Sequence, residues 1–271
     1  DTEPLFAPDY LALARWVAAT YLSPLGEVLS AMLPGARRTR EMPEVSGDEP
    51  TVAPERIELS PEQEHALQAI TGSGAPGEES WFYLYGITGS GKTEVFLRAA
   101  EAVIARGESV IYLVPEIALT HQLFDHISRR FGPIAAMLHS GLTPSQRLGE
   151  WRRIQRGEAR LVVGARSAVF APVYRLGLVV IDEEHENSYK AGNAPRYHAR
   201  QVALWRSVRA GAVCVMGSAT PSVEAWYLME TGRLTRLELT ERLSGGALPR
   251  IAVHNLRGGD SLLSAPLLQA L

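Results

Sequence analysis

Apolar residues form short unbroken stretches from residue 81 onward, and longer amphipathic stretches separate them. The apolar stretches read WFYLYG, SVIYLVP, ARLVVGA, LGLVVIDEE and AVCVMGSAT, beginning at residues 81, 109, 159, 176 and 212. Strands without polar alternation lie inside a parallel sheet, because helices cover both of its faces. The pattern therefore predicts an α/β fold, a central parallel sheet flanked by helices.

The first part of the chain has a different pattern. Apolar positions over residues 9–33 recur at helical spacing, and SPLG at 23–26 breaks them in two. A stretch rich in proline and charge, without periodicity, follows and is typical of a linker. We expect a helical segment over 1–35, a linker over 36–58 and one large domain over 59–271. The first residue is Asp, and an amphipathic pattern continues up to Leu271, so we expect a piece of a longer protein.

Composition narrows the function only slightly. No apolar window is long enough for a membrane span and no signal pattern opens the chain, so we expect a cytoplasmic protein without a membrane partner. The single cysteine, Cys214, excludes a disulfide framework or a thiolate metal cluster within these residues. The net charge of −3 does not indicate nucleic acid, so any basic surface must be local.

A phosphate-binding loop follows the first apolar stretch. The pattern G-x-x-x-x-G-K-[ST] is filled by Gly86, Ile87, Thr88, Gly89, Ser90, Gly91, Lys92 and Thr93. Its glycines allow backbone N–H groups to face phosphate oxygens at a helix N-terminus. Lys92 would bridge the outer phosphates of ATP, and Thr93 would ligate Mg²⁺. A simple strand-to-helix connector is the alternative.

Acidic residues follow a later apolar stretch, where α/β sheets place their ligands. Asp182 would hold Mg²⁺, and Glu183 would orient and deprotonate the attacking water. His185 would sense the γ-phosphate region. Alone, this DEEH tetrapeptide could equally be a solvated helix N-terminus; the phosphate loop upstream favours catalysis.

These motifs carry a family resemblance. DEEH followed by GSAT at 217–220 resembles the first motor lobe of superfamily 2 helicases. The ordered segments GITGSGKTEV, VPEIALT, LHSGL, GARSAVFAP, IDEEHENSYK, PRYHAR and GSATPSVE resemble the PriA family of replication-restart helicases (primosomal protein N′), from about Ile57 to Leu271. Residues 1–35 are similar to the end of that family's N-terminal DNA-binding domain. The linker has no room for the family's winged-helix domain, which is deleted, naturally absent or missing here.

The resemblance implies a RecA-like P-loop NTPase domain in an ATP-dependent helicase. Such a protein moves 3′ to 5′ on DNA, recognises stalled forks and initiates primosome assembly. Its implied partners are forked or single-stranded DNA, primosome proteins and single-strand-binding proteins. Gln63 would bind the adenine edge through its amide, although it also suits a capped helix.

The resemblance also implies residues that contact DNA or couple it to hydrolysis. These are Pro115, Glu116, Arg166, Ser167, Tyr189, Lys190, Arg196, Tyr197, His198, Arg200, Ser218 and Thr220. Six of them lie in an aromatic-rich loop over 188–200, where rings and charges together suit single-stranded DNA. Ala165 and Pro195 depart from the family, which usually has Thr and often an aromatic residue there. Unliganded turns, a solvated basic loop and local backbone satisfaction remain the alternatives.

Some parts of the family's machinery do not occur before Leu271. The family completes the ATP site with arginines from a second motor lobe, which also carries Zn²⁺ sites. We therefore expect this chain to bind ATP and Mg²⁺ but to hydrolyse ATP very slowly and not to unwind DNA alone. A fork-binding scaffold and another superfamily 2 translocase are the alternative functions, and a small-molecule kinase fits less well.

Overall fold

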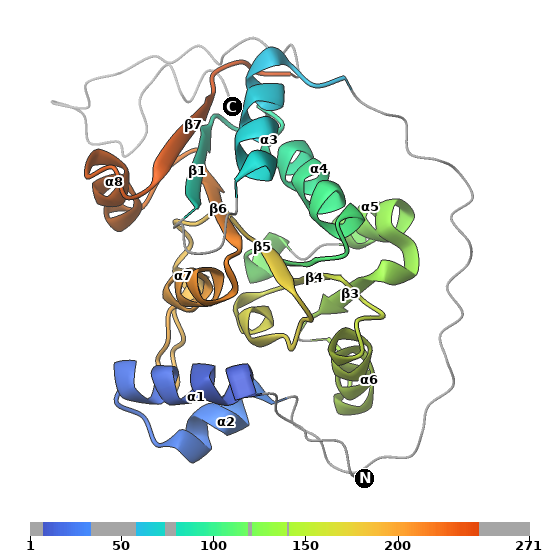
Figure 1. Ribbon diagram of the computed structural model, residues 1–271, viewed down its shortest axis with the longest axis vertical. Coiled ribbons are helices and arrows are strands. Elements are labelled where there is room, and N and C mark those ends of the chain that lie inside the picture. Colours follow the sequence, from blue (N-terminus) through green and yellow to red (C-terminus); the bar gives the residue numbers. More distant parts are fainter. Residues whose placement is uncertain (1–7, 34–57, 74–79, 119–120, 140, 244–271) are drawn as a thin grey trace, which may run out of the picture.

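The computed structural model describes residues 8–33, 58–73, 80–118, 121–139 and 141–243 (Figure 1). The predicted linker up to residue 57 and the chain after 243 lie outside the described residues. The helices are α1 (Pro8–Thr20), α2 (Leu25–Met32), α3 (Pro61–Gly72), α4 (Lys92–Ala105), α5 (His121–Phe131), α6 (Pro144–Gln155), α7 (Ala199–Ala210) and α8 (Val223–Glu230). The strands are β1 (Trp81–Gly86), β2 (Ser109–Leu113), β3 (Ala135–Leu138), β4 (Leu161–Gly164), β5 (Leu176–Asp182), β6 (Val213–Ser218) and β7 (Thr235–Leu239). Short 3₁₀ turns are η1 (Glu116–Ala118), η2 (Gly132–Ile134), η3 (Arg166–Phe170) and η4 (Asn187–Tyr189).

The strands form one parallel sheet in the order β3-β4-β2-β5-β6-β1-β7. The predicted α/β fold is confirmed, and each of the predicted apolar stretches contains a strand. The two edge strands, β3 and β7, were not predicted. Because all strands point the same way, their carboxyl ends share one edge of the sheet, where the loops carrying the sequence motifs begin.

Side chains alternate between the faces of the sheet and build two hydrophobic clusters. Phe82 and Leu84 belong to the cluster that also includes residues of α3, α4 and α5, whereas Trp81 and Tyr83 belong to the cluster that includes residues of α6 and α7. Neither face of a central strand reaches water, which explains why these strands are apolar throughout. No helix in the described part of the chain combines the length and apolarity that a membrane span requires.

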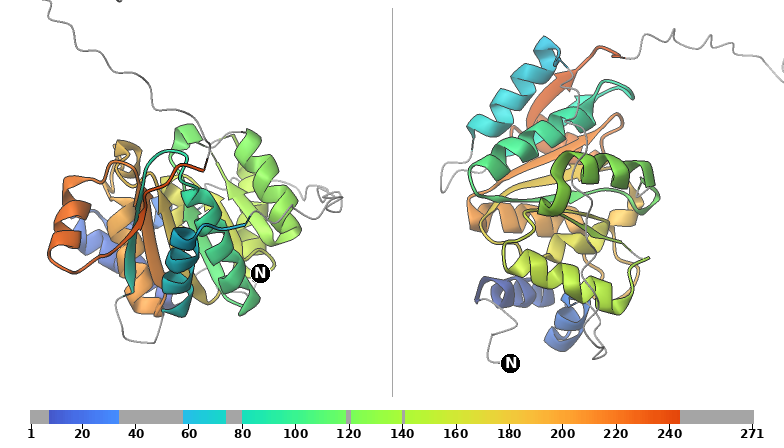
Figure 2. Two further views of the ribbon diagram at one scale, coloured as in Figure 1. Left: turned by 90° about the horizontal axis from the view of Figure 1, so that it is seen from above. Right: turned by 90° about the vertical axis from the view of Figure 1, so that its right-hand side faces the viewer.

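The N-terminal helices α1 and α2 form a further layer outside α7. The hydroxyl of Tyr10 in α1 donates to the carbonyl of Met32 in α2 at 2.8 Å. Trp16 stacks on Trp205 of α7, with ring centroids 5.2 Å apart. These helices and α3 lie at opposite ends of the molecule (Figures 1 and 2). The helix pair is thus part of the same packed body as the sheet domain.

Candidate functional site

The phosphate loop connects β1 to α4 at the carboxyl edge of the sheet. Gly89 and Gly91 have φ of +84° and +80°, which glycine adopts without steric cost. The Lys92 side chain is buried, and its Nζ donates to the Gly86 carbonyl at 2.7 Å. The Ser90 hydroxyl is buried and has no hydrogen-bond partner among the described residues. The loop therefore holds an ammonium and an unsatisfied hydroxyl, both of which suit phosphate oxygens.

Gln63 is hydrogen-bonded to this loop. It is 1% exposed; its Oε1 accepts from the Ser60 N–H at 2.9 Å, and its Nε2 donates to the Ser90 carbonyl at 3.1 Å. The first bond belongs to a capping box that starts α3. Gln63 therefore ties the start of α3 to the phosphate loop, and its predicted contact with adenine stays a prediction.

The segment after β7, which the sequence did not indicate, is also hydrogen-bonded to the phosphate loop. After β7, the Leu243 N–H donates to the Gly89 carbonyl at 3.1 Å, and Arg242 Nε donates to the Thr88 carbonyl at 3.2 Å. Thr240 donates to the Glu62 carboxylate through its N–H and its hydroxyl. Residues 240–243, which follow the last strand of the sheet, are thus hydrogen-bonded to the predicted nucleotide site and to the start of α3.

The predicted Mg²⁺ ligands Thr93 and Asp182 meet at one hydroxyl. Tyr112 in β2 donates to Asp182 Oδ2 at 3.0 Å, and the Thr93 side chain lies beside the same hydroxyl. Burial raises the pKa of the Asp182 carboxyl to about 6, although the Tyr112 bond opposes this rise. A carboxylate whose charge is disfavoured gains from a cation. The residues therefore fit Mg²⁺, which keeps several waters and needs only one or two carboxylates.

Glu183 and His185 converge on Ser218 at the end of β6. The Ser218 hydroxyl donates to Glu183 Oε2 at 2.9 Å, accepts from the Thr220 N–H at 3.0 Å and lies 2.7 Å from His185 Nδ1. Since its one proton goes to Glu183, His185 Nδ1 is assigned as the donor. Glu183 has φ +45°, an uncommon conformation for a residue with a side chain and typical of functional sites.

The third acidic residue of the tetrapeptide, Glu184, has a structural position that the sequence did not reveal. It is 2% exposed and forms an ion pair with Arg200, which is 8% exposed. Ser222 donates to Glu184 at 2.8 Å and accepts from Arg200 at 2.7 Å, and its hydroxyl also caps α8. Arg200 is thus turned inward to the acidic edge and is not on the surface of the aromatic-rich loop.

Within the aromatic-rich loop, two tyrosines face the interior. Tyr189 donates to the Asp182 carbonyl at 2.6 Å, and Tyr197 packs on Phe170, with ring centroids 4.7 Å apart. Both rings are therefore packed inside the protein, and the contact with single-stranded DNA expected of them stays a prediction. The charged side chains on the loop surface are Lys190 and Arg196.

His198 is the N-cap residue of α7, at the end of the same loop. Its Nδ1 accepts from the Arg200 N–H at 3.2 Å, which caps the helix. Burial, with the charge of Arg200 as a second cause, lowers the pKa of His198 to about 4, so the ring is neutral at pH 7.

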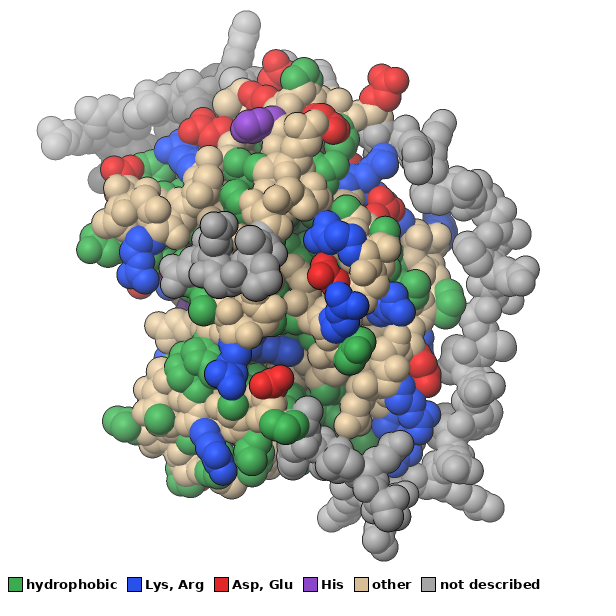
Figure 3. Space-filling model, in the orientation of Figure 1, with side chains coloured by type: hydrophobic (Ala, Val, Ile, Leu, Met, Phe, Trp, Pro, Cys, Tyr) green, Lys and Arg blue, Asp and Glu red, His purple; other side chains and the backbone are tan. Residues whose placement is uncertain are grey.

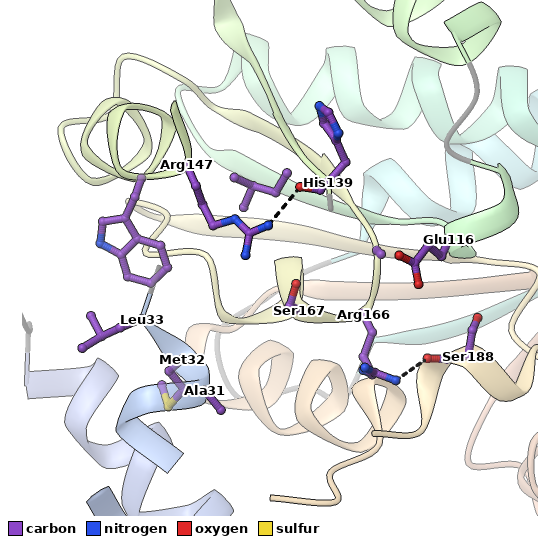
Figure 4. Close-up of a pocket in the computed structure, with 12 residues that line it drawn as sticks. Ala31, Met32, Leu33, Glu116, His139, Arg147, Arg166, Ser167 and Ser188 are labelled. Atoms are coloured by element: carbon purple, nitrogen blue, oxygen red, sulfur yellow. Dashed lines mark hydrogen bonds between the residues drawn. The ribbon is translucent and has the colours of Figure 1, made fainter. Parts of the chain in front are cut away.

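A cavity of about 220 Å³ lies between α2 and the loops at the sheet edge (Figure 4). Its lining comprises Ala31, Met32, Leu33, Glu116, Leu138, His139, Arg147, Trp151, Ala165, Arg166, Ser167 and Ser188. Arg166 donates to the Ser188 carbonyl at 2.9 Å, and Arg147 donates to the His139 carbonyl at 3.1 Å. Arg166 Nε and Ser188 Oγ are buried without a partner among the described residues.

This cavity combines apolar and basic walls. The wall from α2 is apolar, and the opposite wall carries arginines and hydroxyls. Lys and Arg side chains also gather over the middle of this face of the molecule, between the N-terminal helices and α3 (Figure 3). The structure places the predicted Glu116, Arg166 and Ser167 here, and Pro115 is buried beside them. Arg147 and the α2 wall were not predicted.

A nucleotide-type loop, an acidic strand end and a basic cavity on one sheet edge define a helicase motor lobe. A family model described as DEAD/DEAH box helicase matches residues 60–226, and the chain belongs to this family. A second model, described as a 3′ DNA-binding domain, matches residues 1–34. The chain is similar to the replication restart protein PriA of Treponema pallidum, with 55% identity over 267 residues, 98% of this chain and 40% of that protein. The corresponding protein of Bacillus subtilis is 42% identical over 222 residues, 80% of this chain and 28% of that protein.

These comparisons confirm the predicted resemblance to the PriA family. The chain spans about two fifths or less of the length of the two relatives named. Among solved structures, RecG bound to a three-way DNA junction has a similar fold, with a TM-score of 0.51 and 23% identity over 71% of this chain and 25% of that one. That likeness supports the motor fold alone.

Proposed function

We propose that this chain is the ATP-binding first motor lobe of a DNA helicase that moves 3′ to 5′, recognises stalled replication forks and initiates primosome assembly for replication restart. The observation that carries the proposal is the meeting of Thr93 and Asp182 at Tyr112, on the sheet edge that also borders the basic cavity. In this assignment residues 1–35 close a DNA-binding domain, 36–58 are a linker and 59–271 form the lobe.

At the nucleotide site, bound ATP with Mg²⁺ supplies the γ-phosphoryl group and a divalent charge. Lys92 exchanges its bond to the Gly86 carbonyl for phosphate oxygens, and the Ser90 hydroxyl gains a partner. Thr93 and Asp182 would hold the ion. Glu183 orients and deprotonates the attacking water. A change at Glu183 reaches His185 and Thr220 through their shared bonds to Ser218.

At the DNA site, the basic cavity holds the phosphate backbone of a single strand. Arg166 and Ser167 contact phosphates, and Arg147 adds a second positive charge on the same side. Such contacts position a strand without reading its sequence, as a motor that moves along any DNA requires. Lys190 and Arg196 extend the positive surface.

The finer partners follow from the same proposal. Primosome proteins and single-strand-binding proteins are the protein partners of the full protein in this proposal, and Zn²⁺ sites belong to its second motor lobe. The second lobe also supplies the arginines of the ATP site, which are worth about 10³ to 10⁵ in rate in related systems. This chain alone therefore binds ATP and Mg²⁺ with little turnover. A cytoplasmic location stays a prediction.

The test is a titration of a fluorescent ATP analogue with Mg²⁺, with and without a forked oligonucleotide. Lys92→Ala should lose binding at least tenfold, since a charge-assisted phosphate contact disappears. Arg106→Ala is the matched control, because Arg106 ends the same helix at the surface. If the fork binds but the nucleotide does not, a fork-binding scaffold replaces the proposal. In the full-length protein, ATP turnover that forks do not stimulate would also overturn it.

A further inference from the structure

We infer that Tyr21 is a positioning residue, which links the N-terminal helix pair to the base of the aromatic-rich loop and thereby couples bound DNA to ATP turnover. The inference rests on the proposed function, since it concerns how the two DNA-facing parts control one catalytic edge. Tyr21 follows α1 directly, and its N–H continues the helix by donating to the Val17 carbonyl at 3.0 Å.

The Tyr21 side chain reaches three partners in the motor lobe. Its hydroxyl accepts from the His198 N–H at 3.2 Å and donates to Gln201 Oε1 at 2.5 Å. The Nζ of Lys190 lies 5.3 Å from the centre of its ring, within range of a cation–π contact. The Tyr21 hydroxyl thus donates one hydrogen bond and accepts another within residues 198–201 of the motor lobe.

The partners of Tyr21 define the base of the loop. Lys190 and His198 face each other in an antiparallel bridge, and the Ala191 N–H donates to the Tyr197 carbonyl at 2.8 Å. This bridge closes residues 191–197 into a loop with a narrow neck. Tyr21 holds both sides of the neck, through the backbone of His198 and the ammonium of Lys190.

The same neck is bonded to the DNA cavity and to the catalytic edge. Arg166 of the cavity donates to the carbonyls of Ser188 and Lys190, at 2.9 and 2.7 Å. Two residues past His198, Arg200 forms its buried ion pair with Glu184, which adjoins the predicted base Glu183. A shift of the neck therefore moves groups that contact DNA and groups that hold the acidic edge.

Tyr21 is also fixed on its own side. The Trp16 ring lies edge-on to Tyr21, with centroids 6.3 Å apart, and stacks on Trp205 of α7. A helix pair held at α7 and bonded at the neck forms a rigid brace between two elements of the motor. We expect this brace to keep the neck in the arrangement that fork-stimulated turnover requires, and coupling between sites of this kind typically amounts to 5- to 150-fold.

The experiment uses the full-length parent protein with Tyr21→Phe, which removes the hydroxyl and keeps the ring. Tyr174→Phe is the matched control, since Tyr174 is 65% exposed. Basal ATP turnover, turnover at saturating fork, KM for ATP and fork Kd are measured for each. In Tyr21→Phe we expect fork-stimulated kcat to fall about tenfold, while basal turnover, KM and fork Kd stay within twofold.

Each of the other outcomes overturns a specific part of the inference about Tyr21. If Tyr21→Phe behaves like Tyr174→Phe, Tyr21 does not position the neck. If fork Kd weakens tenfold and kcat at saturating fork is unchanged, Tyr21 binds DNA and couples nothing. If basal turnover falls equally, the hydroxyl supports only the fold. A wild-type protein that no fork stimulates overturns the proposed function itself, and the inference with it.

Discussion

Removing the guanidinium of Arg200 should destabilise the lobe far more than a surface arginine does. Glu184 is 2% exposed, and among the described residues its one ion pair is with Arg200. Arg200→Ala leaves that carboxylate buried, with Ser222 and Tyr83 as remaining donors. Breaking a buried pair from one side costs about 3–5 kcal/mol. We expect a loss in this range at pH 8.

Urea unfolding of the wild type, Arg200→Ala, Glu184→Gln and the double variant would measure this loss. The double variant should be less destabilised than the two single losses combined, with a coupling energy of about 2 kcal/mol. The control is Arg156→Ala, whose exposed pair with Glu158 spans 3.8 Å; its cost should stay below about 1 kcal/mol.

The reasoning fails if Arg200→Ala costs no more than Arg156→Ala. It also fails if the losses in the double variant are additive. Any of these results would mean that water reaches Glu184 and that the pair does not hold the acidic edge to α8.

The remaining predictions concern the nucleotide site and the core. Asp182→Asn should raise the free energy of unfolding by about 2 kcal/mol at pH 8. Folding raises the pKa of this carboxyl from 3.8 to about 6, so its ionised form destabilises the folded state above pH 6. Urea unfolding should show that the gain fades towards pH 4, and turnover in the full protein should be lost. Cys214 should resist a thiol reagent until the lobe unfolds, since burial raises its pKa to about 12. Gly91→Ala should cost about 1–3 kcal/mol and weaken ATP-analogue binding, because its φ is +80° and the new Cβ would meet Gln63. Gly149→Ala, on open α6, should instead stabilise by about 0.5–1 kcal/mol in thermal unfolding.

Hydrophobic patterning was sufficient for the centre of the sheet and insufficient for its edges. Central strands are buried on both faces, so they appear as unbroken apolar runs. Strand β7 alternates, with Arg236 and Glu238 exposed and Leu237 and Leu239 buried. Strand β3 spans only Ala135–Leu138. Such short or alternating segments differ little from loops until their neighbours are known.

The place of the predicted phosphate loop, between β1 and α4, could be derived from the sequence because its backbone conformation sets the residue pattern. The phosphate loop needs glycines at fixed positions, so its spacing alone identifies it. The direction of a side chain is set by tertiary contacts instead. The sequence could not show that Arg200 turns inward to Glu184 while Arg196 stays exposed. The cavity wall from α2 was hidden for the same reason, since residues more than a hundred positions apart build it.

The layer formed by α1 and α2 also sets a practical limit on how the lobe can be shortened. Arg206 of α7 donates to the carbonyls of Val169 and Ala171, beneath Tyr10 of α1. A chain trimmed to the 60–226 match would uncover this side of α7, including the ring of Trp205, and would also lose β7. A newly bared apolar surface favours self-association. Trimming to the helicase family boundary would therefore favour aggregation, whereas keeping residues 8–33 and 235–243 would keep these apolar surfaces covered.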